Sequence, residues 1–145
     1  MSFYADTSFL FSYYASDANS VQADAWRQVH PEPLLFTALH QLELRNAFEL
    51  AVFQNRVTTK EAAELWAQVE VDLSAGLLVG PVLSLPDLFR QTDSLVEHHT
   101  AHTGARSLDI LHVAAAQLLA ADELVTFDVR QISLANRIGL RVALL

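Results

Sequence analysis

The chain of 145 residues is 52% hydrophobic and has no proline-, glycine- or serine-rich linker, so we expect one domain over residues 1–145 with a substantial core. It contains no cysteine, which excludes disulfide scaffolds, thiolate zinc sites and thiol nucleophiles. Nine basic and seventeen acidic residues give a net charge of -8, so binding to a nucleic acid would need a local basic rim.

Short apolar runs alternate with helical patterns along the chain. Thr58 and Glu61 have the spacing of a capping box at one helix start. After Ser107, which we expect to cap the next helix, an almost continuous apolar sequence predicts a buried helix. The expected strands cover residues 2–5, 34–37, 77–83, 124–127 and 140–144, and the expected helices cover residues 7–14, 21–30, 39–54, 59–74, 86–103, 108–121 and 129–138.

This alternation predicts an α/β fold with a central, mostly parallel sheet and helices on both faces. Residues 77–83 suit an edge strand because Gly80 and Pro81 interrupt them. No apolar run approaches the roughly 18 residues of a membrane span, and the N-terminus lacks the features of a signal peptide. We therefore expect a soluble, cytoplasmic protein that does not contact membranes.

In an α/β sheet the functional crevice lies at the edge beyond the carboxyl ends of the strands, and four carboxylates are expected at that edge. Asp6 and Asp128 follow apolar strands, while Glu43 and Asp109 lie early in helices whose first turns could point at the same edge. Carboxylates that converge repel one another unless a cation balances them. An all-oxygen site suits Mg²⁺ or Mn²⁺, which would activate water and neutralise charge on a phosphate. The pattern therefore predicts metal-assisted phosphodiester hydrolysis.

The segments around these acids, YADTSFL, LHQLELRNAF, RSLDILHVAAA and LVTFD, resemble the four acidic motifs of PIN-domain ribonucleases in order and spacing. At this length the chain is most similar to the VapC-type toxins of prokaryotic toxin–antitoxin pairs. The resemblance implies a PIN-like three-layer sandwich and a Mg²⁺- or Mn²⁺-dependent endoribonuclease, often a homodimer, with an antitoxin that covers the acidic site. Carried over by position, Asp6 and Asp109 become the principal metal ligands, and Glu43 and Asp128 complete the catalytic pocket.

Four neighbours of these acids are further candidates. The hydroxyls of Ser8 and Thr126 are expected to orient the carboxylates. Arg106 and Arg130 flank two of the motifs and are candidates for contacts with RNA phosphates, although they belong to no family signature.

A purely structural interpretation competes with this one. Asp6, Asp109 and Asp128 all lie where helices begin, and there a carboxylate caps the helix and interacts favourably with its dipole. Glu43 is too far into its helix to cap, so it discriminates between the two interpretations. The alternative function is a catalytically silent PIN-fold module that binds RNA or a protein; loss of an acid would be its signature, and none is lost.

The histidines and the lysine leave further alternatives. His98 and His102 have the i, i+4 spacing of a zinc pair but lack a third ligand, so exposed histidines are favoured. His112, one turn after Asp109, is interpreted as a packing residue in preference to a hydrogen-bond partner of the pocket. An aspartyl-phosphate phosphatase or receiver domain would want a lysine near the acids, and Lys60 is expected far from them.

One apolar series on the helix that carries Glu43 is open to two interpretations. Leu42, Leu50 and Phe53 are most simply a core stripe, but in a protein that dimerises they extend past the surface of one subunit.

Overall fold

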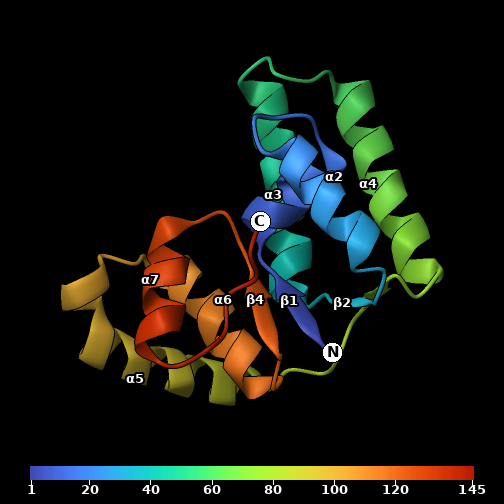
Figure 1. The fold of residues 1–145 in the computed structure, drawn as a ribbon. Coiled ribbons are helices and arrows are strands. Elements are labelled where there is room, and N and C mark those ends of the chain that lie inside the picture. The colour runs from blue at the N-terminus through green and yellow to red at the C-terminus, as the bar shows by residue number, and fades with distance from the viewer.

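The computed structural model describes residues 1–145 and is built on a four-stranded parallel sheet (Figure 1). The strand order is β3-β2-β1-β4, so β1 lies in the interior of the sheet and β3 at an edge, as predicted. In register, Phe3 pairs with Leu34 on one side and with Glu123 on the other. The strands are β1 (Phe3–Ala5), β2 (Leu34–Leu35), β3 (Leu78–Val79) and β4 (Glu123–Val125).

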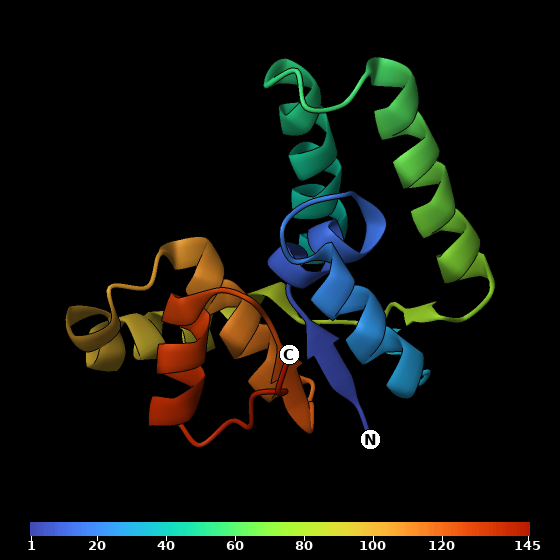
Figure 2. The same ribbon diagram turned by 45° about the horizontal axis from the view of Figure 1, so that its top comes forward.

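Helices cover both faces of this sheet. Figure 1 shows α2, α3 and α4 on one side of the strands and α5, α6 and α7 on the other, and Figure 2 shows the α3–α4 hairpin extending away from the sheet. The helices are α1 (Thr7–Tyr14), α2 (Ser20–Val29), α3 (Ala38–Phe53), α4 (Thr59–Ser74), α5 (Leu85–Thr103), α6 (Ser107–Leu118) and α7 (Val129–Arg137). None of them is long and apolar enough to cross a bilayer.

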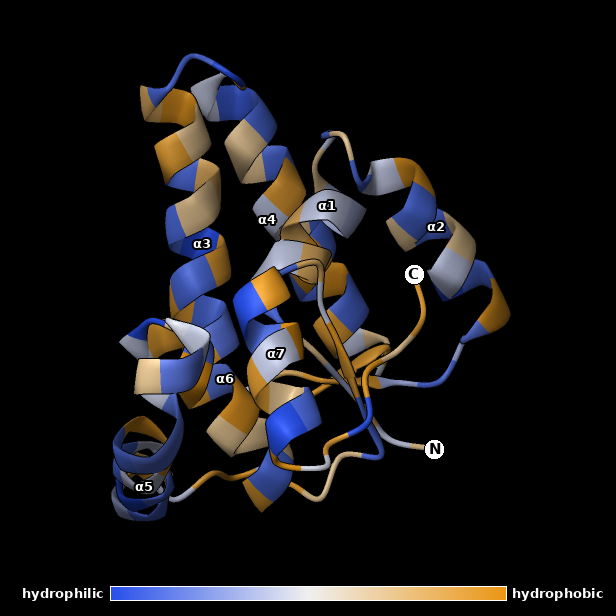
Figure 3. Cartoon of the chain, turned by 60° about the vertical axis from the view of Figure 1, so that its left-hand side comes forward, coloured by the Kyte–Doolittle hydropathy of each residue, from blue (hydrophilic) through white to orange (hydrophobic).

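The sheet separates two hydrophobic cores because successive strand side chains point to opposite faces. Phe3 belongs to the core beneath α1 to α4, with Trp26 and Phe48, whereas Tyr4 belongs to the core beneath α5 to α7, with Ile110. In Figure 3 the strands at the centre are hydrophobic, while α5 is mostly hydrophilic on the face in view. The three-layer arrangement predicted from the sequence is therefore confirmed.

Two sequence-based expectations about the C-terminal third are wrong. Residues 140–144 do not form a strand and contribute one parallel bridge, between Leu124 and Val142. The helix cap is Arg106 and not Ser107, because the Asp109 carboxylate accepts the backbone N–H of Arg106 at 3.0 Å and so begins the helix one residue earlier. The other strands are shorter than predicted, which leaves Thr126 and Phe127 in the loop after β4.

Candidate active site

The local fold accounts for three of the four acids. Asp6 directly follows β1 and caps α1, and its carboxylate accepts the N–H of Phe9 at 3.0 Å. Asp128 caps α7, where its Oδ1 accepts the N–H groups of Arg130 and Gln131 at 2.8 and 3.2 Å. Asp109 lies in the first turn of α6. Each of these carboxylates satisfies donors that a helix start leaves free.

Asp6 is buried, with 1% of its surface exposed, and both of its oxygens are engaged. Oδ1 accepts from Ser8 Oγ at 2.8 Å in addition to Phe9 N–H, and Oδ2 accepts from Ser8 Oγ at 2.9 Å and from Gln131 Nε2 at 2.9 Å. Burial raises the pKa of Asp6 above its usual value, and the charge of His112 and these hydrogen bonds offset only part of that rise.

The same contacts connect Asp6 to Asp128. Ser8 Oγ lies 3.4 Å from Thr126 Oγ1, which accepts the N–H of Asp128 at 2.9 Å. Gln131 completes the connection, since its side chain donates to Asp6 and its backbone N–H to Asp128. We call this group the Asp6 cluster; its members are Asp6, Ser8, Thr126, Asp128 and Gln131. The sequence analysis missed Gln131, although a glutamine one turn into a helix that begins at a candidate acid was a usable signal.

Glu43 is held by residues from other elements. Its Oε2 accepts from Thr7 Oγ1 of α1 at 3.0 Å and forms a short hydrogen bond with Nε2 of His112 on α6. On the other side of that imidazole, Nδ1 lies 2.9 Å from Tyr4 Oη. Burial would raise the pKa of Glu43, but the hydrogen bonds from His112 and Thr7 and the charge of His112 outweigh it and lower the pKa below its usual value. Tyr4, Thr7, Glu43 and His112 form the Glu43 cluster.

The interpretation of His112 as a packing residue is therefore wrong. Its side chain is buried, with 2% exposed, yet it bridges a phenol and a carboxylate. The signal in the sequence was its position one turn after Asp109, which places it on the side of α6 that meets the site.

Three buried rings lie together where the elements that carry the acids meet. The ring centroids of Tyr4 and His40 are 4.6 Å apart, and those of His40 and His112 are 5.1 Å apart. His40 also joins α3 to the end of β1, because its Nε2 lies 2.8 Å from the carbonyl oxygen of Ala5. Tyr4 is two residues from Asp6, and His40 and His112 are each three residues from an acid on their own helix, so the packing of the rings sets the relative positions of Asp6, Glu43 and Asp109.

The remaining candidates stand apart from these contacts. Asp109 is half-buried, and its one hydrogen bond is to Arg106 N–H. Arg106 and Arg130 are exposed, and their guanidinium groups form neither hydrogen bonds nor ion pairs. His98 and His102 are exposed too, and no three histidine, aspartate or glutamate side chains lie close enough together to hold a metal ion.

Comparisons with known proteins show which solved structures share this architecture. No family model matches the sequence, and no curated protein matches it. A solved structure of Mycobacterium tuberculosis VapC20, described as a sarcin–ricin loop cleaving toxin, matches with a TM-score of 0.65 and 16% identity over 88% of this chain and 90% of that chain. The chain has the PIN-domain fold.

Two further structures share this PIN fold. FitAcB from Neisseria gonorrhoeae matches with a TM-score of 0.64 and 18% identity over 98% of this chain and 96% of that one. VapBC2 from Rickettsia felis, solved bound to a DNA fragment from their promoter, matches with a TM-score of 0.65 and 16% identity over 99% and 98%. The fold predicted from the acidic motifs is thus confirmed over almost the whole chain.

Two hollows of the PIN fold meet at Thr7. One of about 410 Å³ is lined by Glu43 together with Leu42, Leu50 and Leu108. The other, of about 370 Å³, runs along α1 from Ser8 to Arg56, whose guanidinium carbon lies 5.3 Å from the centre of the Phe11 ring. Glu43 lines the first hollow, whereas none of the predicted acids lines the second, which reaches the site through Thr7 and Ser8.

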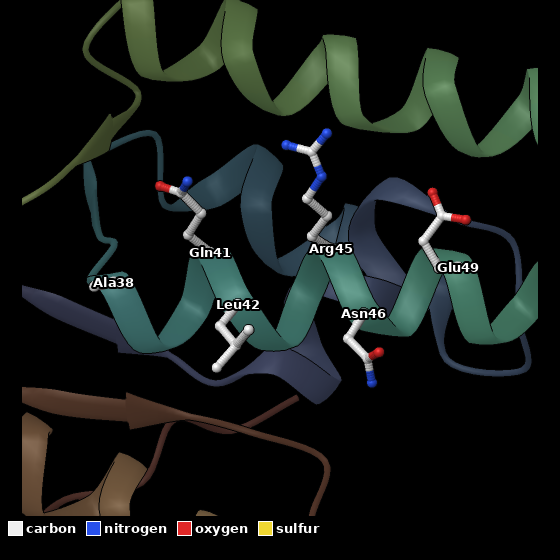
Figure 4. Close-up of a pocket in the computed structure, with 6 residues that line it drawn as sticks. All are labelled: Ala38, Gln41, Leu42, Arg45, Asn46 and Glu49. Carbon is white, nitrogen blue, oxygen red and sulfur yellow. The ribbon is translucent and has the colours of Figure 1, made fainter.

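A larger hollow, of about 510 Å³, lies on the outer side of α3 and contains none of the predicted acids. Figure 4 shows its lining: Gln41 and Arg45 point toward α4, whereas Leu42 and Asn46 point away from it.

The apolar stripe of α3 lies largely at the surface, since Leu42 is 70% exposed and Phe53 is 83% exposed. The core interpretation of the stripe formed by Leu42, Leu50 and Phe53 is therefore wrong.

The acids of the PIN fold suit a hard divalent cation in their donor chemistry. Oδ1 of Asp109, Oε1 of Glu43 and Oδ2 of Asp128 have no partner within the protein, so each offers one carboxylate oxygen. The absence of a three-ligand group is compatible with Mg²⁺, which keeps several waters and binds through one or two carboxylates together with substrate phosphate.

Proposed function

We propose that this chain is a metal-dependent endoribonuclease that hydrolyses RNA phosphodiester bonds and acts as the toxin of a type II toxin–antitoxin pair. The observation that carries the proposal is Glu43. It caps no helix, yet His112 and Thr7 hold it beside the element that carries Asp6 and leave one of its oxygens free. Helix stability does not account for this arrangement, whereas a site for a phosphate-bound cation does.

Each acid has a stated part in the proposed reaction. Asp109, Glu43 and Asp128 would hold Mg²⁺ or Mn²⁺ through their free oxygens, and Asp6 would join them by exchanging one of its hydrogen bonds. When bound, the cation supplies an activated water and neutralises charge that develops on the phosphate. Ser8 and Thr126 keep Asp6 and the start of α7 in place.

The RNA strand is proposed to lie in the hollow that adjoins Ser8 and Thr7. Arg56 supplies a cation there, held over the Phe11 ring, and an unpaired base can stack on its guanidinium plane. Arg106, the N-cap of α6, and Arg130, in the first turn of α7, are proposed to contact neighbouring phosphates. These three arginines are the proposed basic rim of the acidic protein.

Two protein partners complete the proposal. The toxin assignment follows the similarity to VapC20, which is described as a toxin, and it implies an antitoxin that covers the acids. A homodimer would bury the exposed stripe of Leu42, Leu50 and Phe53 and pool arginines from two subunits against the net charge of -8 each. Analytical ultracentrifugation at micromolar concentration tests the dimer, which a monomeric protein would contradict; Phe53→Ser is expected to weaken it.

The decisive experiment is RNA cleavage by the purified protein with Mg²⁺ or Mn²⁺, with EDTA, and with Asp109→Asn. We expect metal-dependent cleavage that both EDTA and the substitution abolish. Asp93→Asn, at an exposed aspartate on α5, is the matched control and should cleave normally. A folded, partner-free protein that cleaves no RNA in a varied set and binds no divalent ion would favour the catalytically silent module.

A further inference from the structure

We infer that His112 is a positioning residue for the proposed ribonuclease reaction, which fixes Oε2 of Glu43 and leaves Oε1 as the atom that meets the cation or substrate. The inference rests on the proposed function. It concerns a residue outside the four acidic positions, to which the resemblance assigns no role.

The contacts divide the two oxygens of Glu43. Oε2 is held by His112 Nε2 and by Thr7 Oγ1 at 3.0 Å, whereas Oε1 has no partner within the protein. The Glu43 side chain is 20% exposed, while that of His112 is 2% exposed. The carboxylate is thus fixed from its buried side and open on the other.

His112 carries a proton on Nε2, the nitrogen that faces Glu43, whether its ring is neutral or charged. Tyr4 Oη lies 2.9 Å from Nδ1, so the phenol is placed to donate its proton to that nitrogen. A neutral imidazole then carries its proton on Nε2, and a charged imidazole carries one there as well. In both states Nε2–H donates to Glu43, so the contact is a constant feature of the site.

The bridge also connects the elements that bring the acids together. Tyr4 belongs to β1, Glu43 to α3 and His112 to α6, whose first turn contains Asp109. A packing role in the core would be met by any apolar side chain of similar size, which would leave Tyr4 Oη and Glu43 Oε2 without these partners. Hydrogen bonds that orient ligand side chains typically change metal affinity or activity by about 10- to 100-fold when they are lost.

The chain permits a matched pair of variants at this position. In His112→Gln the side-chain amide nitrogen lies near the place of Nε2 and can still donate to Glu43, whereas the shorter His112→Asn reaches only the place of Nδ1. Both variants lose the ring, so both are expected to lower the melting temperature similarly. We expect kcat to fall about 10- to 100-fold in His112→Asn and within about threefold of the parent in His112→Gln, with an unchanged KM for RNA in both.

Two measurements besides activity keep the test sharp. Calorimetric titration with Mn²⁺ should show weaker binding for His112→Asn than for His112→Gln, and ¹⁵N-resolved NMR should show a hydrogen-bonded Nε2–H that changes on Glu43→Gln. The same pair of substitutions at exposed His98 is the control and should change neither. If neither His112 variant folds, Thr7→Val, which removes the second donor to Oε2, should lower kcat in the same direction.

The outcomes separate the inference from the proposed function. Equal kcat and equal Mn²⁺ affinity in the Asn and Gln variants, with active parent protein, would overturn the role of His112 and leave the ribonuclease proposal standing. A parent protein that cleaves no RNA would overturn the ribonuclease proposal, and the inference with it, even if NMR shows the Nε2–H contact. Loss of kcat in Asn with recovery in Gln would support both.

Discussion

Asp6 and Glu43 belong to one candidate site, but they are held in different ways. Asp6 takes its contacts from its own helix start and from Gln131, and both of its oxygens are engaged. Glu43 caps nothing, and both of its donors come from other helices. The pKa values of the two acids shift in opposite directions. Burial raises the pKa of Asp6, whereas His112 and Thr7 lower the pKa of Glu43 despite burial. Capping accounts for the position of the first acid, whereas the second is held by contacts that join three separate helices.

The largest expected effect is a loss of activity on substitution of Glu43, with little loss of stability. Glu43→Gln should lower kcat/KM for RNA at least about 100-fold, a loss of roughly 2.7 kcal/mol of transition-state stabilisation, because the free oxygen loses its charge. Its free energy of unfolding should change by less than about 1 kcal/mol, since Gln can still accept from Thr7 and His112. Glu49→Gln, at an exposed position of the same helix, is the control. Retained cleavage in Glu43→Gln would remove Glu43 from the site.

Asp6→Ala should instead be the most destabilising substitution among the acids. It removes the cap of α1, at about 1 kcal/mol, and leaves the buried amide of Gln131 without its acceptor, at about 1–3 kcal/mol. Urea unfolding should therefore show a loss of roughly 2–4 kcal/mol. Asp128→Ala is the comparison because it removes only a cap, and it should lose about 1 kcal/mol. Equal losses would mean that the Gln131 contact contributes nothing.

The pH dependence of stability should have opposite signs for the two acids. The raised pKa of Asp6 means that its ionisation favours the unfolded chain, so its contribution is present below its ordinary pKa and is lost as pH rises through the raised value. The lowered pKa of Glu43 means that its contribution is present above its ordinary pKa and is lost as pH falls through the lowered value.

Chemical unfolding of three proteins between about pH 3 and pH 7 measures this difference. Relative to the parent, Asp6→Asn should gain stability as pH rises, and Glu43→Gln should lose it. Parallel curves for the two variants would contradict the contrast between the acids.

The smallest expected effect concerns the hollow along α1, whose lining residues Thr7 and Ser8 hydrogen-bond to Glu43 and Asp6. Arg56→Gln should raise KM for single-stranded RNA about fivefold, near 1 kcal/mol, and reduce the salt dependence of binding by about one unit of slope, with kcat unchanged. Arg137→Gln, at the exposed end of α7, is the control. If both substitutions had the same effect, the strand would not follow the α1 hollow.

The sequence was informative wherever a pattern is local. Alternating runs predicted the parallel sheet and the edge position of β3, and the residues around the acids predicted the PIN fold that the structural comparisons confirm. The same local rules failed where a distant partner decides. The terminal residues 140–144 pair with β4 by only one bridge, and the Leu42 stripe faces solvent although its spacing suits a core.

By itself, the sequence determined which residue types are available and where helices begin, because capping and hydrophobic periodicity act over a few residues. It therefore predicted four candidate acids and the elements that carry them. Only the tertiary structure decided which donors meet them. Tyr4, Glu43 and His112 are far apart along the chain, and their hydrogen bonds exist because the cores on the two faces of the sheet fix β1, α3 and α6 against one another. Contacts between distant elements depend on how those elements pack, and local sequence patterns do not predict them.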